Sequence, residues 1–200
     1  MSIKVKRMVK VSVDAFQVGD VIKFKLTNGA KVQAMAMQQE EDGMIFCLVD
    51  CLPGRWPMNA WTHEGGYEKS TLRKSLNAEI LDFFPEELKA VMAPFENGDF
   101  LRIPTEREIF GENQYGEYEN PYMKQWKPMK QCRNRIAVDG IKAWVLQQYW
   151  LTNKARESNV LSSFRNPAAF FTVADCYGKA DYNDGIHALG VRPVFKIKNF

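Results

Sequence analysis

The sequence lacks any long apolar run. None of its 200 residues belongs to a stretch of about 18 consecutive apolar residues, the length that a membrane-spanning helix needs. The N-terminus carries Lys4, Lys6 and Arg7, but the apolar segment of a signal peptide does not follow them. We therefore predict a protein with no membrane contact and no signal peptide.

Metal-binding and redox motifs are also missing. The chain has 2 histidines and 4 cysteines, and no two cysteines form the C-x-x-C pair of a structural zinc site. The residues concerned are His63, His187, Cys47, Cys51, Cys132 and Cys176. We predict no metal and no cofactor, and we expect the cysteines to be buried free thiols of a reducing compartment.

No charge of one sign dominates the chain. It has 27 basic and 24 acidic residues and a net charge of +3, so its charge alone does not indicate a nucleic-acid partner. Hydrophobic residues make up 46% and charged residues 26%, which are the proportions of an ordinary globular protein. We expect a well-formed core in one domain, with or without a small appended subdomain.

Residues 1–52 show the pattern of a three-stranded antiparallel meander. Apolar and polar residues alternate from Ile22 to Leu26, and Asn28-Gly29, which favours a tight hairpin turn, follows them. The continuous apolar run at 44–49 predicts a strand that is buried on both faces, hence a central one. We predict that this meander packs on a main domain formed by residues 53–200, and the alternative that its strands pair with the C-terminal sheet stays open.

Capping residues mark two helix starts. Ser70 is a preferred N-cap residue, and Leu72, Leu76 and Ile80 behind it form one apolar stripe. Thr105-x-x-Glu108 is the pattern of a capping box, in which each residue satisfies a backbone amide of the other. We predict a helix from Ser70 and a helix of one to two turns after the capping box.

The last fifty residues contain three apolar segments that we predict to be neighbouring strands. They are centred on Trp150, Val173 and Val194, and polar loops separate them. Pro193 restricts the last strand to an edge or a bulge. Arg192 lies in this otherwise apolar strand, and we expect it to form a structural ion pair, with a ligand contact as the alternative.

Short motifs in a fixed order resemble a bacterial and phage domain family of unknown function with a C-type-lectin-like fold. The motifs run from Tyr67-x-x-Ser70 through Leu101-x-x-Pro104 and Tyr149-Trp150-Leu151-Thr152 to Gly190-Val191-Arg192-Pro193-Val194. This family is similar in architecture to formylglycine-generating enzymes and to the variable proteins of diversity-generating retroelements. The residues that carry the resemblance are Ser70, Leu72, Arg73, Leu76, Asn77, Trp150, Gly190, Arg192 and Pro193.

The resemblance implies an α+β fold, namely a C-type-lectin-like mixed or antiparallel sheet with two packed helices and long loops, preceded by the meander of residues 1–52. It also implies a protein of the bacterial cytoplasm or of a phage virion. Glu119-Asn120-Pro121 has the residues of a lectin calcium motif in a different order, so we predict no calcium-bridged sugar site. Cys176 is the one cysteine near the C-terminus, where the oxidases have a pair, which speaks against oxidase chemistry.

Two polar loops, 152–169 and 177–188, favour a non-catalytic recognition domain. Their side chains offer adaptable hydrogen bonding and aromatic anchors, as antibody combining sites do. The candidate ligand-binding residues are Asn153, Arg156, Asn159, Arg165, Asn166, Tyr177, Tyr182, Asn183, Asp184 and His187. We expect a protein or glycan ligand, and the alternative that these loops are merely solvated stays open.

Two other functions remain as alternatives. The first is an enzyme related to the formylglycine-generating oxidases, in which Cys176 acts with His187 and Asp184; such a pair must lie within hydrogen-bond reach. The second is a weak nucleic-acid-binding module that uses the basic N-terminal arm and the segment 122–135, which carries several lysines and two aromatic residues, Tyr122 and Trp126. We assign no catalytic residue, and we regard nucleic acid as the less favoured partner.

Overall fold

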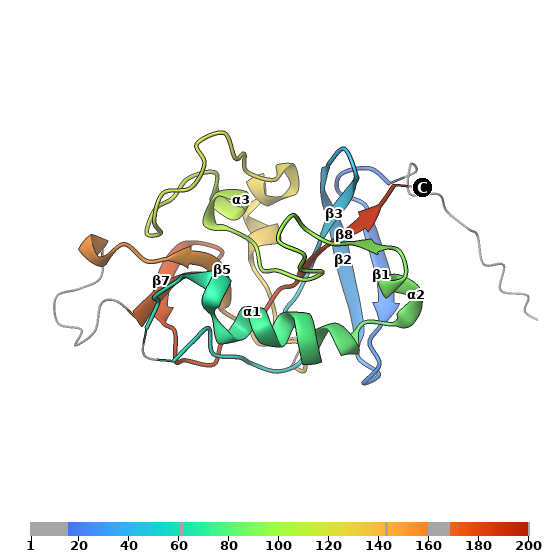
Figure 1. Cartoon of the computed structure of the whole chain (residues 1–200), viewed down its shortest axis with the longest axis horizontal. Helices are drawn as coiled ribbons and strands as arrows, with labels where there is room; N and C mark the ends of the chain where they lie inside the picture. The colour runs from blue at the N-terminus through green and yellow to red at the C-terminus, as the bar shows by residue number, and fades with distance from the viewer. Residues whose placement is uncertain (1–15, 61, 143, 160–168, 200) are drawn as a thin grey trace, which may run out of the picture.

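A computed structural model of the chain describes residues 16–60, 62–142, 144–159 and 169–199. Its strands are β1 (Val21–Lys25), β2 (Lys31–Gln39), β3 (Gly43–Leu48), β4 (Met92–Ala93), β5 (Tyr149–Lys154), β6 (Phe170–Ala174), β7 (Ala180–Asp184) and β8 (Val194–Lys198). They form two mostly antiparallel sheets, which together with the short helices make an α+β fold (Figure 1). The basic N-terminal arm, Arg165 and Asn166 lie outside the described residues.

The larger sheet has the order β1-β2-β3-β8-β4, and all neighbouring strands in it are antiparallel. The predicted N-terminal meander is therefore confirmed as β1-β2-β3, and its third strand is central, with all six residues buried. Its partner β8 comes from the other end of the chain, and Phe46 faces Phe195 across the pair. The meander and the C-terminal strand thus share one sheet and one apolar cluster.

The β1–β2 hairpin forms where the sequence predicts it. The Gly29 amide donates to the Leu26 carbonyl at 2.9 Å, and the Leu26 amide donates to the Ala30 carbonyl at 2.8 Å. Of the pair Asn28 and Gly29, only the glycine has a positive φ, of 92°. Asn28 instead accepts the Ala30 N–H through Oδ1 at 3.0 Å. The turn is therefore one residue longer than the two-residue turn that Asn-Gly favours.

Both faces of the larger sheet are covered, which gives the molecule three layers. On one face, Phe46 shares a buried apolar cluster with Leu72 of the main helical segment. On the other face, Val194 shares a second cluster with Ile109 of α3 (Glu106–Phe110). This double burial explains why β3 is apolar at every position after Gly43 and why β8 begins with Val194 and Phe195, since each strand contributes side chains to both clusters.

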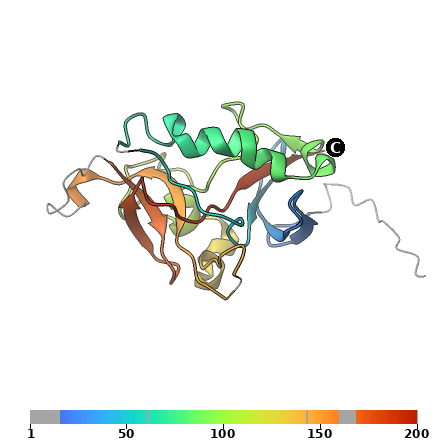
Figure 2. The same cartoon turned by 90° about the horizontal axis from the view of Figure 1, so that it is seen from below.

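The main helical segment starts where its capping residue predicts. Ser70 Oγ accepts the Arg73 N–H at 3.1 Å at the start of α1 (Thr71–Ser75). A π-helical turn (Leu76–Ile80) and a 3-10 turn (Leu81–Phe83) continue the segment, which runs along one side of the molecule past both sheets (Figures 1 and 2). The next helix, α2 (Glu86–Lys89), is a single turn. The fold therefore has one main helix rather than the two that the resemblance implies.

The helix α3 begins with the predicted capping box. Thr105 Oγ1 accepts the Glu108 N–H at 3.1 Å, and Glu108 Oε2 accepts the Thr105 N–H at 2.9 Å. The helix ends after five residues at Gly111, whose φ of 87° is the left-handed conformation common at helix C-termini. Within the described ranges, no helix has the length and apolar character to cross a membrane.

The smaller sheet has the order β5-β6-β7, and Trp150 faces Val173 in it. The prediction that Val194 lies beside these two residues is wrong, because its strand β8 belongs to the larger sheet. Val194 and Phe195 are both buried and contribute to different apolar clusters. Strand β8 therefore needs a sheet that is covered on both sides, and the larger sheet provides it.

Arg192 forms no ion pair with any described residue, so the predicted structural ion pair is wrong. Its Nε donates to the Leu48 carbonyl at 2.9 Å. Its Nη1 donates to the Asn134 carbonyl at 3.2 Å and to the Tyr149 hydroxyl at 2.9 Å. The acceptors around this guanidinium are backbone carbonyls and a phenol because the strands that surround it carry mainly apolar side chains.

Candidate functional site

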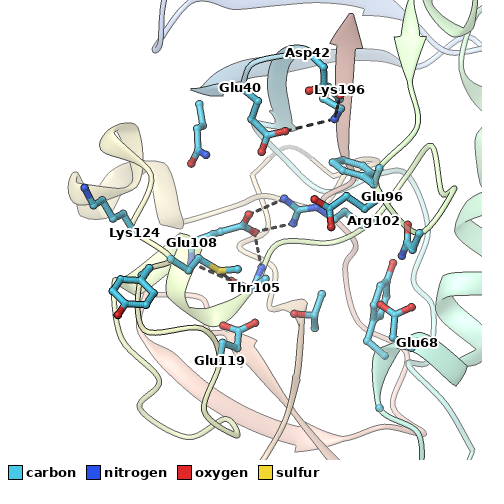
Figure 3. Close-up of a pocket in the computed structure, with 18 of the residues that line it drawn as sticks. Glu40, Asp42, Glu68, Glu96, Arg102, Thr105, Glu108, Glu119, Lys124 and Lys196 are labelled. Atoms are coloured by element: carbon cyan, nitrogen blue, oxygen red, sulfur yellow. Dashed lines mark hydrogen bonds and ion pairs between the residues drawn. The ribbon is translucent and has the colours of Figure 1, made fainter.

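An open groove of about 1340 Å³ lies between the larger sheet and the loops around α3 (Figure 3). Residues from distant parts of the sequence form its walls, and they meet only in the folded chain. These residues belong to 38–42 at the end of β2 and the turn after it, 65–68 before α1, 95–97 after β4, 102–108 and 119–124, with Thr152 and Lys196. The groove therefore combines rigid strand and helix ends with loops.

Carboxylates outnumber cations in the lining of this groove. The acidic residues that line it are Glu40, Glu41, Asp42, Glu68, Glu96, Glu108 and Glu119, and the basic ones are Arg102, Lys124 and Lys196. The chain as a whole carries a net charge of +3. The net charge of the groove lining is therefore negative, whereas that of the whole chain is positive. A positively charged ligand would be attracted to the groove rather than to the rest of the surface.

Arg102 and Glu108 form a bidentate ion pair in the middle of the groove (Figure 3). The two guanidinium nitrogens donate to the two carboxylate oxygens at 2.7 and 2.6 Å. Burial lowers the pKa of Arg102, but the charge and hydrogen bonds of Glu108 outweigh this effect and hold the pKa above its ordinary value. The ring of Phe95 lies 4.9 Å from the guanidinium carbon. Arg102 is therefore a fixed and neutralised part of the groove.

Lys196 forms a second pair at the sheet end of the groove. Its side chain is 6% exposed, and Nζ lies 2.5 Å from Asp42 and 3.5 Å from Glu40. The hydrogen bond from Lys196 lowers the pKa of Asp42, which keeps this carboxylate ionised. Two of the three lining cations are thus already matched by carboxylates of the groove itself.

Glu41, Glu96 and Glu119 are lining carboxylates that form no ion pair with any residue in the described ranges. Burial raises the pKa of Glu119, and its hydrogen bonds with Asn153 and Asn113 offset part of that rise. Glu96 is exposed. These three carboxylates supply negative charge that the described residues leave unneutralised within the groove.

Glu106 fixes the loop after α3 that carries Glu119 and forms one wall of the groove. Its side chain is fully buried and accepts the backbone N–H groups of Gln114, Tyr115 and Gly116 at 3.0, 2.9 and 2.8 Å. A Cβ atom at Gly116 would lie only 2.6 Å from a Glu106 oxygen, so a glycine is required there. The carboxylate thus anchors the start of the loop whose later part lines the groove.

Several residues that the sequence predicts as ligand contacts support this same wall. Asn153 is 6% exposed, and its Oδ1 accepts the Glu106 N–H at 2.8 Å. Arg156 and Asn159 donate to the Gln114 carbonyl at 2.5 and 3.1 Å. None of these three residues lines the groove, although their neighbour Thr152 does. Their predicted ligand contact remains a prediction, and their observed contacts are within the fold.

The other predicted ligand residues gather around β7. Tyr182 packs on Tyr115, with ring centres 5.4 Å apart. His187 Nδ1 lies 2.7 Å from Asn183 Oδ1 at the end of the strand. Asp184 accepts the N–H two residues further along the chain. Tyr177, by contrast, is 71% exposed in the β6–β7 turn. The prediction that 177–188 is a loop is wrong for Ala180–Asp184, which form β7 and pair with β6. No residue of this segment lines the groove.

The structure separates the residues of the enzyme alternative. Cys176 lies in the turn before β7 and His187 lies beyond its other end, so a five-residue strand of roughly 16 Å stands between them. The Cys176 Sγ instead lies 3.7 Å from the Leu146 carbonyl. A Cys–His pair with hydrogen-bond contact is therefore not formed by these residues.

The cysteines fall into two groups. Cys47 and Cys51 are buried free thiols, as expected, and burial raises their pKa values to about 11 and about 12. The same expectation is wrong for Cys132, which is exposed, and for Cys176, which is half-buried. Both of these cysteines lie in turns rather than in the apolar layers, which explains their exposure.

Of the two aromatic residues that the nucleic-acid alternative uses, one is buried and therefore cannot stack on a base. Trp126 is 2% exposed and packs in the second apolar cluster, whereas Tyr122 is 86% exposed. Tyr122 and Lys124 line the carboxylate-rich groove. A polyanion at this position would meet mainly negative charge.

Sequence reasoning missed the groove. The acidic run Glu40-Glu41-Asp42 and the capping-box Glu108 are visible signals, but nothing in the sequence places them opposite each other. In the part of the chain that the structure describes, no three His, Cys, Asp or Glu side chains are grouped so that they could hold a metal ion. Comparisons of the chain with protein families, curated proteins and solved structures find no significant match.

Proposed function

We propose that this chain is a non-catalytic binding domain, and that its groove receives a basic segment of a partner protein. The observation that carries this proposal is the excess of carboxylates over cations in the groove lining. A Lys- or Arg-bearing segment would neutralise Glu96 and Glu119, whereas a neutral glycan would leave both charges uncompensated. The protein ligand is thus favoured over the glycan ligand.

The size of the groove supports an extended ligand. Its volume of about 1340 Å³ exceeds the roughly 300–1,000 Å³ that is typical of small-molecule pockets. The Arg102–Glu108 pair and the Lys196 pairs hold the groove in one arrangement without a ligand. Such preorganisation reduces the entropy that binding costs.

We further propose a recognition role of bacterial or phage origin with a C-type-lectin-like architecture, which rests on the motif resemblance. The pairing of an N-terminal with the C-terminal strand supports this proposal at the level of the fold. The single main helix and the place of Val194 in the other sheet differ from what the resemblance implies. The described residues of segments 152–169 and 177–188 remain the second candidate surface, and the exposure of Tyr177 is the observation that favours it.

The test is a binding titration with a Lys- and Arg-rich peptide and a Glu- and Asp-rich peptide of equal length. We expect the basic peptide to bind and the acidic one to fail. The double substitution Glu96→Gln with Glu119→Gln should weaken binding about tenfold, since it removes two unneutralised charges. Added salt should weaken binding as well.

The matched control is the double substitution Glu79→Gln with Glu87→Gln, which changes the net charge equally at exposed positions outside the groove. Equal weakening in the two double variants would indicate a non-specific charge effect and contradict the groove proposal. Binding on a glycan panel, with no peptide binding, would move the assignment to the glycan ligand.

A further inference from the structure

Arg192 is a buried cation whose hydrogen-bonding capacity is not filled. The side chain is 1% exposed, and a guanidinium has five N–H groups. The acceptors Leu48, Asn134 and Tyr149 use the N–H on Nε and the two on Nη1. The two N–H groups on Nη2 have no acceptor among the described residues. Nη2 is not among the fully buried side-chain atoms that lack a partner, so it keeps a small accessible area although the residue as a whole is buried. The partner of these two N–H groups must therefore come from outside the described chain, because donors in such places are nearly always paired.

The charge of Arg192 is also uncompensated. The titratable groups that interact with it electrostatically are Tyr149, Cys47 and Cys51, and burial raises their pKa values to about 12, 11 and 12, so all three are neutral near pH 7. The Tyr149 ring lies 4.7 Å from the guanidinium carbon and offsets part of the charge from one side. No carboxylate in the described ranges pairs with it.

A small cavity adjoins this guanidinium. Its volume is about 40 Å³, which has room for a particle of the size of water or of a halide ion. The residues that line it are Met35, Met37, Val49, Arg133, Asn134, Ile136 and Arg192. The lining thus contains two guanidinium-bearing residues, four apolar side chains and no carboxylate, and it shares no residue with the groove.

We propose that this cavity is a binding site for a small monovalent anion of the chloride type, held between Arg192 and Arg133. The anion accepts the two N–H groups of Nη2 and compensates the buried charge. Phosphate and sulfate do not suit this site, because their extra oxygens and second charge would meet methionine side chains. Arg133 lines the same cavity, is exposed and forms no ion pair with a described residue, so its charge is available to the anion.

The site joins three segments of the fold. Arg192 precedes β8, Leu48 ends β3, and Asn134 belongs to the 3-10 turn Cys132–Arg135. An anion bound here therefore ties the 3-10 turn to the two central strands of the larger sheet. Binding to the folded state alone stabilises it in proportion to the logarithm of anion concentration.

The first test compares thermal unfolding in sodium bromide and in sodium gluconate at equal ionic strength, since gluconate is too large for the cavity. We expect bromide to raise the unfolding midpoint by about 3 °C once its concentration is well above its dissociation constant. Arg133→Gln should lose at least half of this rise. The control Lys130→Gln, an exposed basic residue outside the cavity, should keep all of it.

Equal midpoints in the two salts would overturn the proposal, as would an undiminished bromide effect in Arg133→Gln. The second test is anomalous diffraction from crystals grown in bromide. We expect a peak within hydrogen-bond distance of Arg192 Nη2, and a cavity that holds only water would refute the site. Neither test depends on the groove or on a peptide ligand.

Discussion

Glu106 and Arg192 are buried charges of opposite sign, and neither has an ion-pair partner among the described residues. Glu106 is 0% exposed and Arg192 is 1% exposed. Three backbone N–H groups donate to the Glu106 carboxylate, and the Asn113 amide lies 3.5 Å from it. Arg192, in contrast, finds acceptors for three of its five donors. One buried charge is fully satisfied by its own chain and the other is not.

This difference shows how a buried charge can be retained without a counter-charge. Oriented backbone dipoles substitute for an ion when they fill every position around the charged group. Around Glu106 they do so, because the loop that begins at Asn113 wraps the carboxylate. Around Arg192 two donors remain, and the adjoining cavity is the place where an external anion completes the arrangement. The following experiments test this contrast.

The largest effect is expected at Glu106. Replacing it with glutamine should lower the free energy of unfolding by about 3 kcal/mol, because the amide NH₂ would face backbone N–H groups that the carboxylate now accepts. Urea unfolding measures the loss. Glu112→Gln, at an exposed position just beyond α3, should change stability by less than about 0.5 kcal/mol. Equal losses in the two variants would show that the buried carboxylate has no special role.

A smaller effect is expected at Arg192 when bromide and chloride are absent. Arg192→Met should lower the free energy of unfolding by about 1–2 kcal/mol in sodium gluconate, because losing three hydrogen bonds is partly offset by removing an uncompensated buried charge. The same urea titration in bromide should show a larger gap from the unsubstituted protein. A loss greater than that of Glu106→Gln would reverse the proposed contrast.

Thr105, the uncharged N-cap residue of α3 next to Glu106, shows how much one hydrogen bond contributes to the free energy of unfolding at this place. Thr105→Ala should cost about 1 kcal/mol, because the Glu108 N–H loses its side-chain acceptor. Thr105→Ser keeps the hydroxyl and should cost much less, and chemical denaturation of both variants measures the difference. If alanine and serine were equivalent, the cap would contribute nothing to α3.

The smallest expected effect is the pH dependence of stability that Glu119 causes. Hydrogen bonds offset only part of the cost of burying this carboxyl group. Its pKa is raised in the folded protein, so the folded state holds this proton more tightly than the unfolded chain does. Stability is then lost as the pH rises from the ordinary value of 4.5 through the raised folded-state value. Glu119→Gln lacks this loss, so its stability relative to the unsubstituted protein should increase across that interval and stay constant above it. Parallel pH profiles of the two proteins would contradict this expectation.

Local patterns were sufficient to predict the elements whose determinants lie close together in sequence. The alternation from Ile22, the Asn28-Gly29 turn, the Ser70 cap and the Thr105–Glu108 capping box each depend on residues within one or two turns of chain, and all appear in the structure. The apolar run of β3 correctly indicated a central strand. The same local signals did not distinguish one main helix from two.

The assignment of strands to sheets and the composition of the groove depended on contacts between distant residues. Val194 joins the larger sheet because β8 needs cover on both faces, and the covering helices come from elsewhere in the chain. Arg192 meets Leu48 across 144 residues, and Lys196 meets Asp42 across 154. Hydrophobic periodicity and secondary-structure propensity depend on residues that are close in sequence. The partner of a buried charge, in contrast, is determined only when the burial of apolar side chains brings distant segments together.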